Sequence, residues 1–335
     1  MVNILITGAS GFIGSFLVEK ALEKGYTTWA GIRKSSSREY LTDTRIQFID
    51  LNFANKEILT TQLQTFKQTN GNLNYVIHNA GVTKCLDSTD FDRINYQYTV
   101  NFIDALKEAD CVPDKFLLMS SLSAFGMGDE VNYTPIRLSD EPRPNTVYGI
   151  SKLKAEQYLK QTSNFPYIIL RPTGVYGPRE KDYFLMLKTV KSGFDVGAGF
   201  TPQHLTFIYV KDLVQAAFLG LESPITNRAY FVADGDVHTD KEYTALVKKI
   251  LEKKYVLSLK IPLGVLKCVS IVAEGVSKIT KKPSTLNRDK YKIMKQRNWA
   301  CDIAPLCSDL HFSPAYNLEK GLEESVEWYK VNGWL

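Results

Sequence analysis

The chain has 335 residues, of which 44% are hydrophobic and 23% charged, and this length predicts two domains or one domain with a large appendage. Its net charge of +5 is mild, and basic residues are not interleaved with aromatic ones, which argues against a nucleic-acid partner. The five cysteines are odd in number and form no Cys-x-x-Cys pair, which indicates reduced thiols in a cytoplasmic protein and argues against a disulfide framework or a zinc site.

The first predicted element is an apolar strand, residues 2–6, followed by a helix over 12–24. Three glycines lie between the strand and the first turn of this helix. Gly8 permits a tight turn, Gly11 lets bare backbone approach a pyrophosphate, and Gly14 lets the helix pack closely on its strand. The unpaired N–H groups at the helix start would face the phosphates, so the pattern predicts dinucleotide binding.

A second strand, over 27–32, ends at Arg33, where an acid would bind the adenosine ribose of NAD. Arg33, with Lys34 and three serines beside it, favours a 2′-phosphate and therefore NADP(H). The alternative is that Arg33 stacks on adenine and the cofactor is NAD(H).

Two more strands are predicted over 46–49 and 74–78. The third strand leads into Asp50, which could bond the adenine amino group or cap the next helix. His78 ends the fourth strand inside an apolar run, and we interpret it as a packed core residue. The small residues after it would let a cofactor lie against the sheet edge: Asn79, Ala80 and Gly81.

Strand and helix signals continue to alternate up to about residue 175, which predicts a doubly wound parallel α/β sheet. In a helix over 91–108, Asn95 and Thr99 share one face and are expected to bond neighbouring loops. A fifth strand over 115–119 runs into a serine cluster, and a sixth covers 167–170.

Several short motifs occur together in the order typical of one enzyme family. They are Thr7–Gly14, His78–Gly81, the cluster around Ser121 and Ser123, Tyr148-x-x-x-Lys152, and Arg171–Pro178. In combination they resemble the extended short-chain dehydrogenase/reductases of the NAD-dependent epimerase/dehydratase type. The pattern is most similar to the branch of the 3β-hydroxysteroid dehydrogenases and dihydroflavonol reductases.

The spacing of Tyr148 and Lys152 places both on one helix face. A phenol has a pKa near ~10, and a neighbouring ammonium together with an oxidised nicotinamide ring would lower it. Tyr148 would then serve as the acid/base for the substrate oxygen, and Lys152 would also bond the nicotinamide ribose. Ser121 would hold the substrate oxygen, with Ser123 as the alternative.

The resemblance implies a Rossmann domain, residues 1–172 plus about 205–235, and a smaller mixed α/β substrate domain, residues 173–204 and 236–335. It also implies a homodimer that pairs helices near 91–108 and 148–162. The expected cofactor contacts are Gly8, Gly11, Phe12, Ile13, Gly14, Arg33, Asp50, Leu51, Asn79, Ala80, Gly81, Tyr148, Lys152, Pro172, Thr173 and Val175. The expected substrate contacts are Thr83, Ser123, Phe125 and Tyr148.

Two departures from the family pattern bear on the small-molecule substrate. Nucleotide-sugar enzymes of the family usually carry an asparagine where Gly174 stands and an arginine where Leu205 stands, and both groups handle phosphates. The tail from Lys282-Pro283 to Phe312-Ser-Pro314 also resembles the steroid dehydrogenase branch. We therefore expect hydride transfer on a less charged alcohol or ketone, with a nucleotide-sugar epimerase or dehydratase as the alternative.

The segment 278–297 holds eight basic residues and one acid. It could be a solvated helix face, or it could attract an anionic substrate or a membrane surface. The apolar stretch 261–276 contains Lys267 and Glu274 and is too short to span a bilayer, so no integral membrane segment is expected. No secretory signal is expected either, because the sequence opens on a strand.

Overall fold

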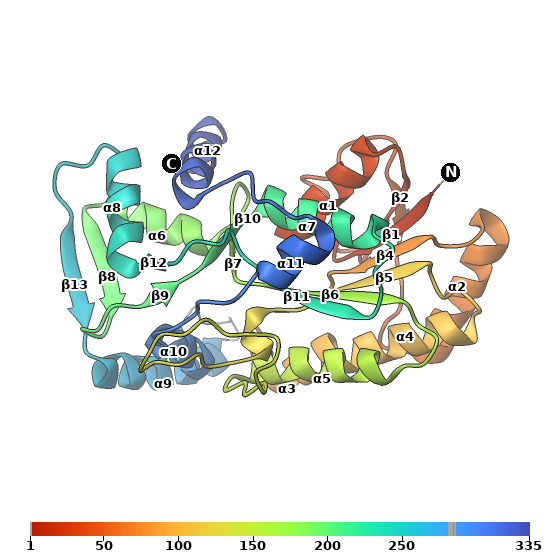
Figure 1. Cartoon of the computed structure of the whole chain (residues 1–335), viewed down its shortest axis with the longest axis horizontal. Helices are drawn as coiled ribbons and strands as arrows, with labels where there is room; N and C mark the ends of the chain where they lie inside the picture. The colour runs from red at the N-terminus through yellow and green to blue at the C-terminus, as the bar shows by residue number, and fades with distance from the viewer. Residues whose placement is uncertain (1, 281–283, 285) are drawn as a thin grey trace.

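The computed structural model describes residues 2–280, 284 and 286–335, and its centre is a seven-stranded parallel sheet (Figure 1). The strand order is β11-β6-β5-β4-β1-β2-β3. The strands are β1 (Asn3–Thr7), β2 (Thr27–Gly31), β3 (Gln47–Ile49), β4 (Tyr75–His78), β5 (Lys115–Met119), β6 (Tyr167–Pro172) and β11 (Arg228–Val232). Helices cover both faces, so the predicted doubly wound α/β fold is confirmed.

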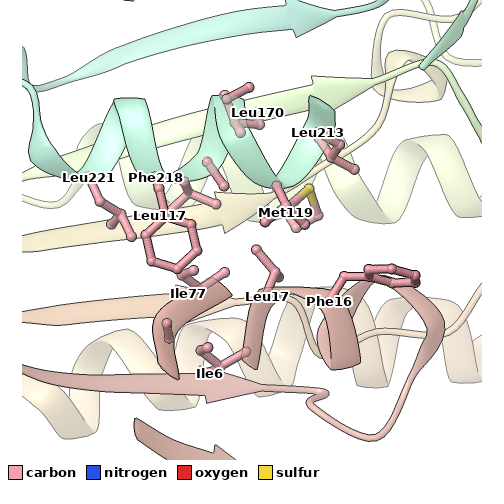
Figure 2. Close-up of a cluster of buried hydrophobic side chains, with 14 of the residues drawn as sticks. Ile6, Phe16, Leu17, Ile77, Leu117, Met119, Leu170, Leu213, Phe218 and Leu221 are labelled. Atoms are coloured by element: carbon pink, nitrogen blue, oxygen red, sulfur yellow. The ribbon is translucent and has the colours of Figure 1, made fainter. Parts of the chain in front are cut away.

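The two faces of the sheet carry separate hydrophobic cores, because successive side chains of a strand point to opposite sides. Ile6, Leu117 and Leu170 pack against α1 (Phe12–Glu23) and α7 (Val210–Glu222), as Figure 2 shows. On the other face the strands pack against three helices: α2 (Lys56–Asn70), α4 (Tyr98–Glu108) and α5 (Val147–Gln161).

The helix predicted over 91–108 is divided in the structure. A short α3 (Thr89–Phe91) leads into a π-helix, η1 (Asp92–Gln97), and then into α4. In this wider turn the Asn95 side chain bonds both backbone groups of Val82 and the hydroxyl of Ser151. The sequence predicted the helix and the role of Asn95, but the change of helix type has no residue pattern of its own.

A second group of elements follows β6 and packs around an aromatic cluster that includes Tyr176, Phe207 and Tyr243. Trp328 and Trp334 are partly buried and pack against this cluster. Three two-stranded sheets belong here: β7 (Gly174–Tyr176) with β10 (Phe207–Tyr209), β8 (Phe194–Ala198) with β13 (Leu257–Ile261), and β9 (His204–Leu205) with β12 (His238–Thr239). The helices here are α6 (Asp182–Lys191), α8 (Asp240–Ile250) and α12 (Leu318–Val331), while α11 (Ala304–Leu310) lies beside β11 and α7.

Two helices, α9 (Leu263–Thr280) and α10 (Arg288–Lys295), pack on each other beyond β13. Among the described residues, no helix combines the length and hydropathy needed to cross a lipid bilayer. Lys281, Lys282 and Pro283, part of the basic segment and of the tail pattern noted above, lie outside the described residues.

Candidate active site

The glycine turn after β1 has the close contacts expected from its sequence. Gly8 has a φ of +65°, and a Cβ there would lie 2.9 Å from the Ala80 backbone. A Cβ on Gly14 would lie 2.1 Å from the Gly8 carbonyl oxygen, so α1 can approach β1 only with glycine at this position. Helix α1 has no side-chain cap and no acid in its first turn, so its N–H groups, including those of Phe12 and Ile13, suit the phosphates of a dinucleotide.

His78 lies beneath this turn as a buried, neutral side chain. Its ring bonds the hydroxyls of Thr7 at 2.9 Å and Thr99 at 3.0 Å, and Thr7 also accepts the Ala80 N–H. Burial, with the charge of Lys152 as a smaller cause, lowers the pKa of His78 to about 3. The interpretation of His78 as a packed core residue is confirmed.

The predicted adenosine-binding residues follow β2 and β3 on the same edge of the sheet. Arg33 is exposed, and across the described part of the chain it forms no ion pair. Asp50 is exposed and Leu51 is buried beside it. Asn55, and not Asp50, caps α2, so the alternative of a capping role for Asp50 is wrong.

Tyr148 lies in the first turn of α5, directly facing Ser121 in the loop after β5. The Thr146 hydroxyl caps α5 by accepting the Gly149 N–H at 3.0 Å, which fixes where the helix begins. Burial raises the pKa of Tyr148, and the hydrogen bond with Ser121 opposes that rise. Ser121 Oγ also accepts the N–H of Ser123, which orders this loop.

Lys152 lies one turn further along α5 and is buried. Its Nζ donates to the Met119 carbonyl oxygen at 2.9 Å, and burial lowers its pKa to about 8. The sequence predicted that Lys152 together with an oxidised nicotinamide ring would lower the pKa of Tyr148. In the protein alone burial outweighs any such effect, so the pKa of the phenol is raised instead.

Glu156, one helical turn after Lys152 on α5, forms a buried ion pair with Arg171. The Glu156 carboxylate is fully buried, and it accepts from Arg171 Nη2 at 2.6 Å and from the Ser120 hydroxyl. Glu156 follows Lys152 by four residues and shares its helix face. The sequence analysis missed Glu156, although this spacing and the arginine of the Arg171–Pro178 motif could have indicated it.

The other residues predicted to contact the cofactor or the substrate differ in how far they are buried. Pro172 ends β6, and the Thr173 N–H donates to the Val232 carbonyl oxygen at 3.1 Å, beside the half-buried Val175. Thr83 is exposed. Phe125 is buried, and its ring packs on Phe231 with 4.8 Å between centroids.

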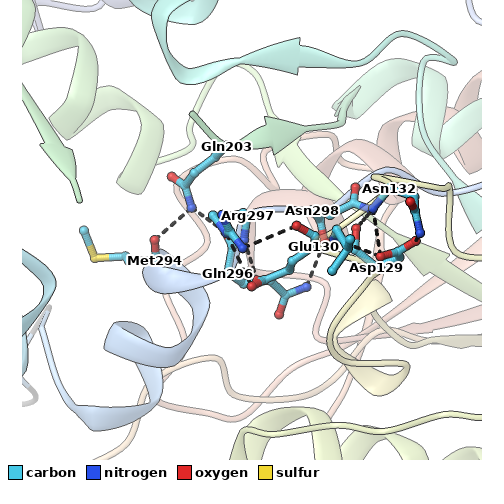
Figure 3. Close-up of polar contacts among 9 residues, drawn as sticks. Asp129, Glu130, Asn132, Gln203, Met294, Gln296, Arg297 and Asn298 are labelled. Atoms are coloured by element: carbon cyan, nitrogen blue, oxygen red, sulfur yellow. Dashed lines mark hydrogen bonds and ion pairs between the residues drawn. The ribbon is translucent and has the colours of Figure 1, made fainter. Parts of the chain in front are cut away.

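Residues that follow α10 form hydrogen bonds with the loop 127–147 (Figure 3). The Arg297 N–H donates to Glu130 Oε1 at 2.8 Å, and Asn298 Nδ2 donates to the Asp129 carbonyl oxygen at 2.9 Å. From α10 itself, Asp289 Oδ2 accepts the Val147 N–H at 2.7 Å, one residue before Tyr148. Helix α10 is therefore bonded directly to the start of α5, the helix that carries Tyr148 and Lys152.

Gly174 and Leu205 are the two departures from the nucleotide-sugar pattern. Aromatic side chains pack against both positions. A Cβ on Gly174 would lie 2.1 Å from the Tyr183 hydroxyl, so any side chain at 174 requires this hydroxyl to shift. Leu205 packs against the aromatic cluster.

Comparison with known proteins agrees with this architecture. The ceramide reductase of Caulobacter vibrioides is 21% identical over 99% of this chain and 96% of its own length. The sterol-4-alpha-carboxylate 3-dehydrogenase of Saccharomyces cerevisiae is 22% identical over 97% of both chains. The UDP-glucose 4-epimerase of Vibrio cholerae is 26% identical over 71% of this chain and 72% of its own.

Solved structures share the fold over the whole length. UDP-glucose 4-epimerase from Thermotoga maritima, with UDP-glucose, superposes with a TM-score of 0.76 at 22% identity, covering 99% of each chain. The dTDP-glucose 4,6-dehydratase of Bacillus anthracis, in complex with NAD, gives 0.77 at 19% identity, covering 100% of this chain and 98% of the other. The model of the NAD dependent epimerase/dehydratase family matches residues 4–233, more than half of the chain. The chain therefore belongs to this family and is an enzyme of the extended short-chain dehydrogenase/reductase type.

Proposed function

We propose that the enzyme is an NAD(P)-dependent oxidoreductase that transfers a hydride between nicotinamide and an alcohol or ketone carbon of a weakly charged small molecule. The observation that carries this proposal is the 2.1 Å approach of the Tyr183 hydroxyl to the Cβ position of Gly174. The asparagine that bonds the diphosphate region in the nucleotide-sugar enzymes would require the Tyr183 hydroxyl to move. The two relatives named as a ceramide reductase and a sterol dehydrogenase, which span nearly the whole chain, support the same substrate class.

The described residues suit proton transfer at the substrate oxygen. Because burial raises the pKa of Tyr148, its phenol is protonated at neutral pH and can donate a proton to an oxygen that becomes negative during carbonyl reduction. The Ser121 hydroxyl faces the same point and would hold that oxygen. Lys152, fixed by the Met119 carbonyl, would reach the ribose next to the nicotinamide. The cofactor supplies the hydride when it is bound.

Two observations favour different cofactors. The exposed Arg33, which forms no ion pair with a described residue, supports NADP(H), since a guanidinium binds a 2′-phosphate well. The related dehydratase structure in complex with NAD supports NAD(H). Fluorescence titration with each dinucleotide distinguishes the two.

A nucleotide-sugar epimerase or dehydratase is the second candidate. The relative and the solved structure that are named as UDP-glucose 4-epimerases favour it. In such an enzyme hydride is taken and returned, so the cofactor is unchanged after each turnover.

A substrate screen followed by nicotinamide absorbance tests the proposal. We expect a net absorbance change with a sterol or a long-chain ketone and none with UDP-glucose. Tyr148→Phe should lose about 10²- to 10⁴-fold in turnover. Tyr255→Phe, a matched change at an exposed tyrosine, should lose nothing. Interconversion of UDP-glucose without an absorbance change would establish the second candidate instead.

The predicted homodimer through helices near 91–108 and 148–162 and the location in the cytoplasm stay predictions. Ile150 is an exposed apolar residue on α5, within the predicted interface. Ile150→Glu should shift the mass measured by light scattering from dimer to monomer if this interface forms.

A further inference from the structure

Helix α9 exposes most of its large apolar residues, although Leu266 is buried. Exposed side chains recur every three or four residues and form one stripe, the outer stripe: Val265, Val269, Val272, Val276 and Ile279. Val272 is 65% exposed and Ile279 83% exposed, whereas the polar Ser270 and Ser277 are buried on the opposite side. A surface helix normally has the reverse arrangement.

The neighbouring two-stranded sheet shows the same inversion. Four large apolar side chains, 44–58% exposed, stand on its outer face and form the sheet patch: Phe194, Val196, Leu257 and Leu259. They are cross-strand neighbours, since Leu257 pairs with Phe194 and Leu259 with Val196. On the inner face Asp195 accepts hydrogen bonds from Thr244 and Ser258, and Lys260 pairs with Asp240.

The two apolar surfaces belong to one end of the molecule. Strand β13 leads into α9 through Pro262, and the Gly199 N–H, just after β8, donates to the Ile261 carbonyl oxygen at 2.8 Å. Figure 1 places β8, β13 and α9 together at the end of the molecule opposite the N-terminus. Exposed apolar patches of this extent mark interaction surfaces.

Exposed cations on α9 and α10 indicate what this end of the molecule contacts. Lys267 on α9 and Lys295 on α10 are exposed and form no ion pair with a described residue. Arg288 on α10 is also exposed, with only a 3.5 Å contact to Glu274. A helix with an apolar face, cations on its polar side and further cations on a helix packed against it is typical of segments that lie in the headgroup region of an anionic membrane.

We propose that the outer stripe and the sheet patch dock the enzyme peripherally on an anionic lipid bilayer. The docked helix packs against α10, and Asp289 of α10 accepts the Val147 N–H beside Tyr148. The bilayer surface thus lies one helix away from the candidate active site. This arrangement suits a weakly charged substrate that partitions into lipid. The statement about the substrate rests on the proposed function, whereas the docking proposal does not.

Sedimentation with vesicles tests docking without any turnover. The full chain is expected to sediment with phosphatidylcholine vesicles that contain phosphatidylglycerol, and less with phosphatidylcholine alone or at high salt. Val272→Glu combined with Val276→Glu should weaken binding by about tenfold or more, since it places charge on the apolar face. Ile58→Glu combined with Val331→Glu adds the same charge at exposed apolar positions of α2 and α12 and should bind as the wild type does.

Dinucleotide binding and circular dichroism establish that each variant is folded. The proposal is wrong if the wild type stays in the supernatant with anionic vesicles, or if the two double variants bind equally. It is also wrong if the wild type binds no vesicle and the Val272→Glu, Val276→Glu variant alone loses self-association, because the surface would then contact a second copy. Because no step depends on the reaction, a failure here leaves the proposed function standing.

Discussion

Removing the charge of Glu156 should destabilise the protein far more than removing an exposed carboxylate. Glu156 and Arg171 are 0% and 2% exposed, and the Arg171 guanidinium reaches the carboxylate at 2.6, 3.0 and 3.1 Å. Glu156→Gln keeps the shape but leaves the buried guanidinium without its counter-charge, which should lower the free energy of unfolding by about 3–5 kcal/mol. That is a large part of the total stability of a typical domain, about 5–15 kcal/mol.

Urea unfolding followed by tryptophan fluorescence measures this loss. The matched control is Glu108→Gln, whose partner Lys56 lies at 2.6 Å but whose pair is 35% and 47% exposed, so the expected loss is about 0.2–1 kcal/mol. Glu156→Met combined with Arg171→Met should recover much of the stability, since no buried charge remains. A Glu156→Gln variant as stable as the Glu108→Gln control would refute the reasoning.

Three further predictions concern the cofactor turn and its surroundings. Gly14→Ala should cost about 1–3 kcal/mol and abolish dinucleotide binding in a titration, because its Cβ would lie 2.1 Å from a carbonyl oxygen, whereas Gly264→Ala, with open space around it, should bind normally. The pKa of His78 is lowered from 6.5 to about 3, so the unfolded chain takes up the proton first. The contribution of His78 to the free energy of unfolding is therefore complete above pH 6.5 and should fall by about 1.4 kcal/mol per pH unit between pH 6.5 and pH 3. Urea unfolding at several pH values measures this slope, and the His78 contribution to it should vanish in His78→Asn. Arg33→Ala should weaken NADPH about tenfold and leave NADH unchanged if Arg33 binds a 2′-phosphate; equal effects on both would contradict that role.

The main sheet could be predicted from the sequence because its strands are continuous apolar runs, each followed by a turn or helix signal. The predicted bounds of β5, residues 115–119, agree with the structure, and the first helix ends within one residue of its predicted end. The small sheets were harder to predict, since β9 and β12 have two residues each and gain their stability only from distant partners.

The geometry of the site was predictable only where its residues are close in sequence. The Tyr148 and Lys152 pair follows from helix spacing, but Asp289 contacts Val147 across 142 positions of the chain. The burial that raises the Tyr148 pKa in the protein alone depends on the packing of the whole loop around it, which no local motif encodes, and a lowered pKa beside a bound oxidised nicotinamide stays a prediction.

The contact between Tyr183 and Gly174 limits how substrate preference can be redesigned. Introducing asparagine at 174 alone would force its side chain into the Tyr183 ring, and shortening Tyr183 alone would open a cavity in the aromatic cluster. The two positions are therefore expected to be coupled, so that the effects of replacing both on stability differ from the sum of the single effects.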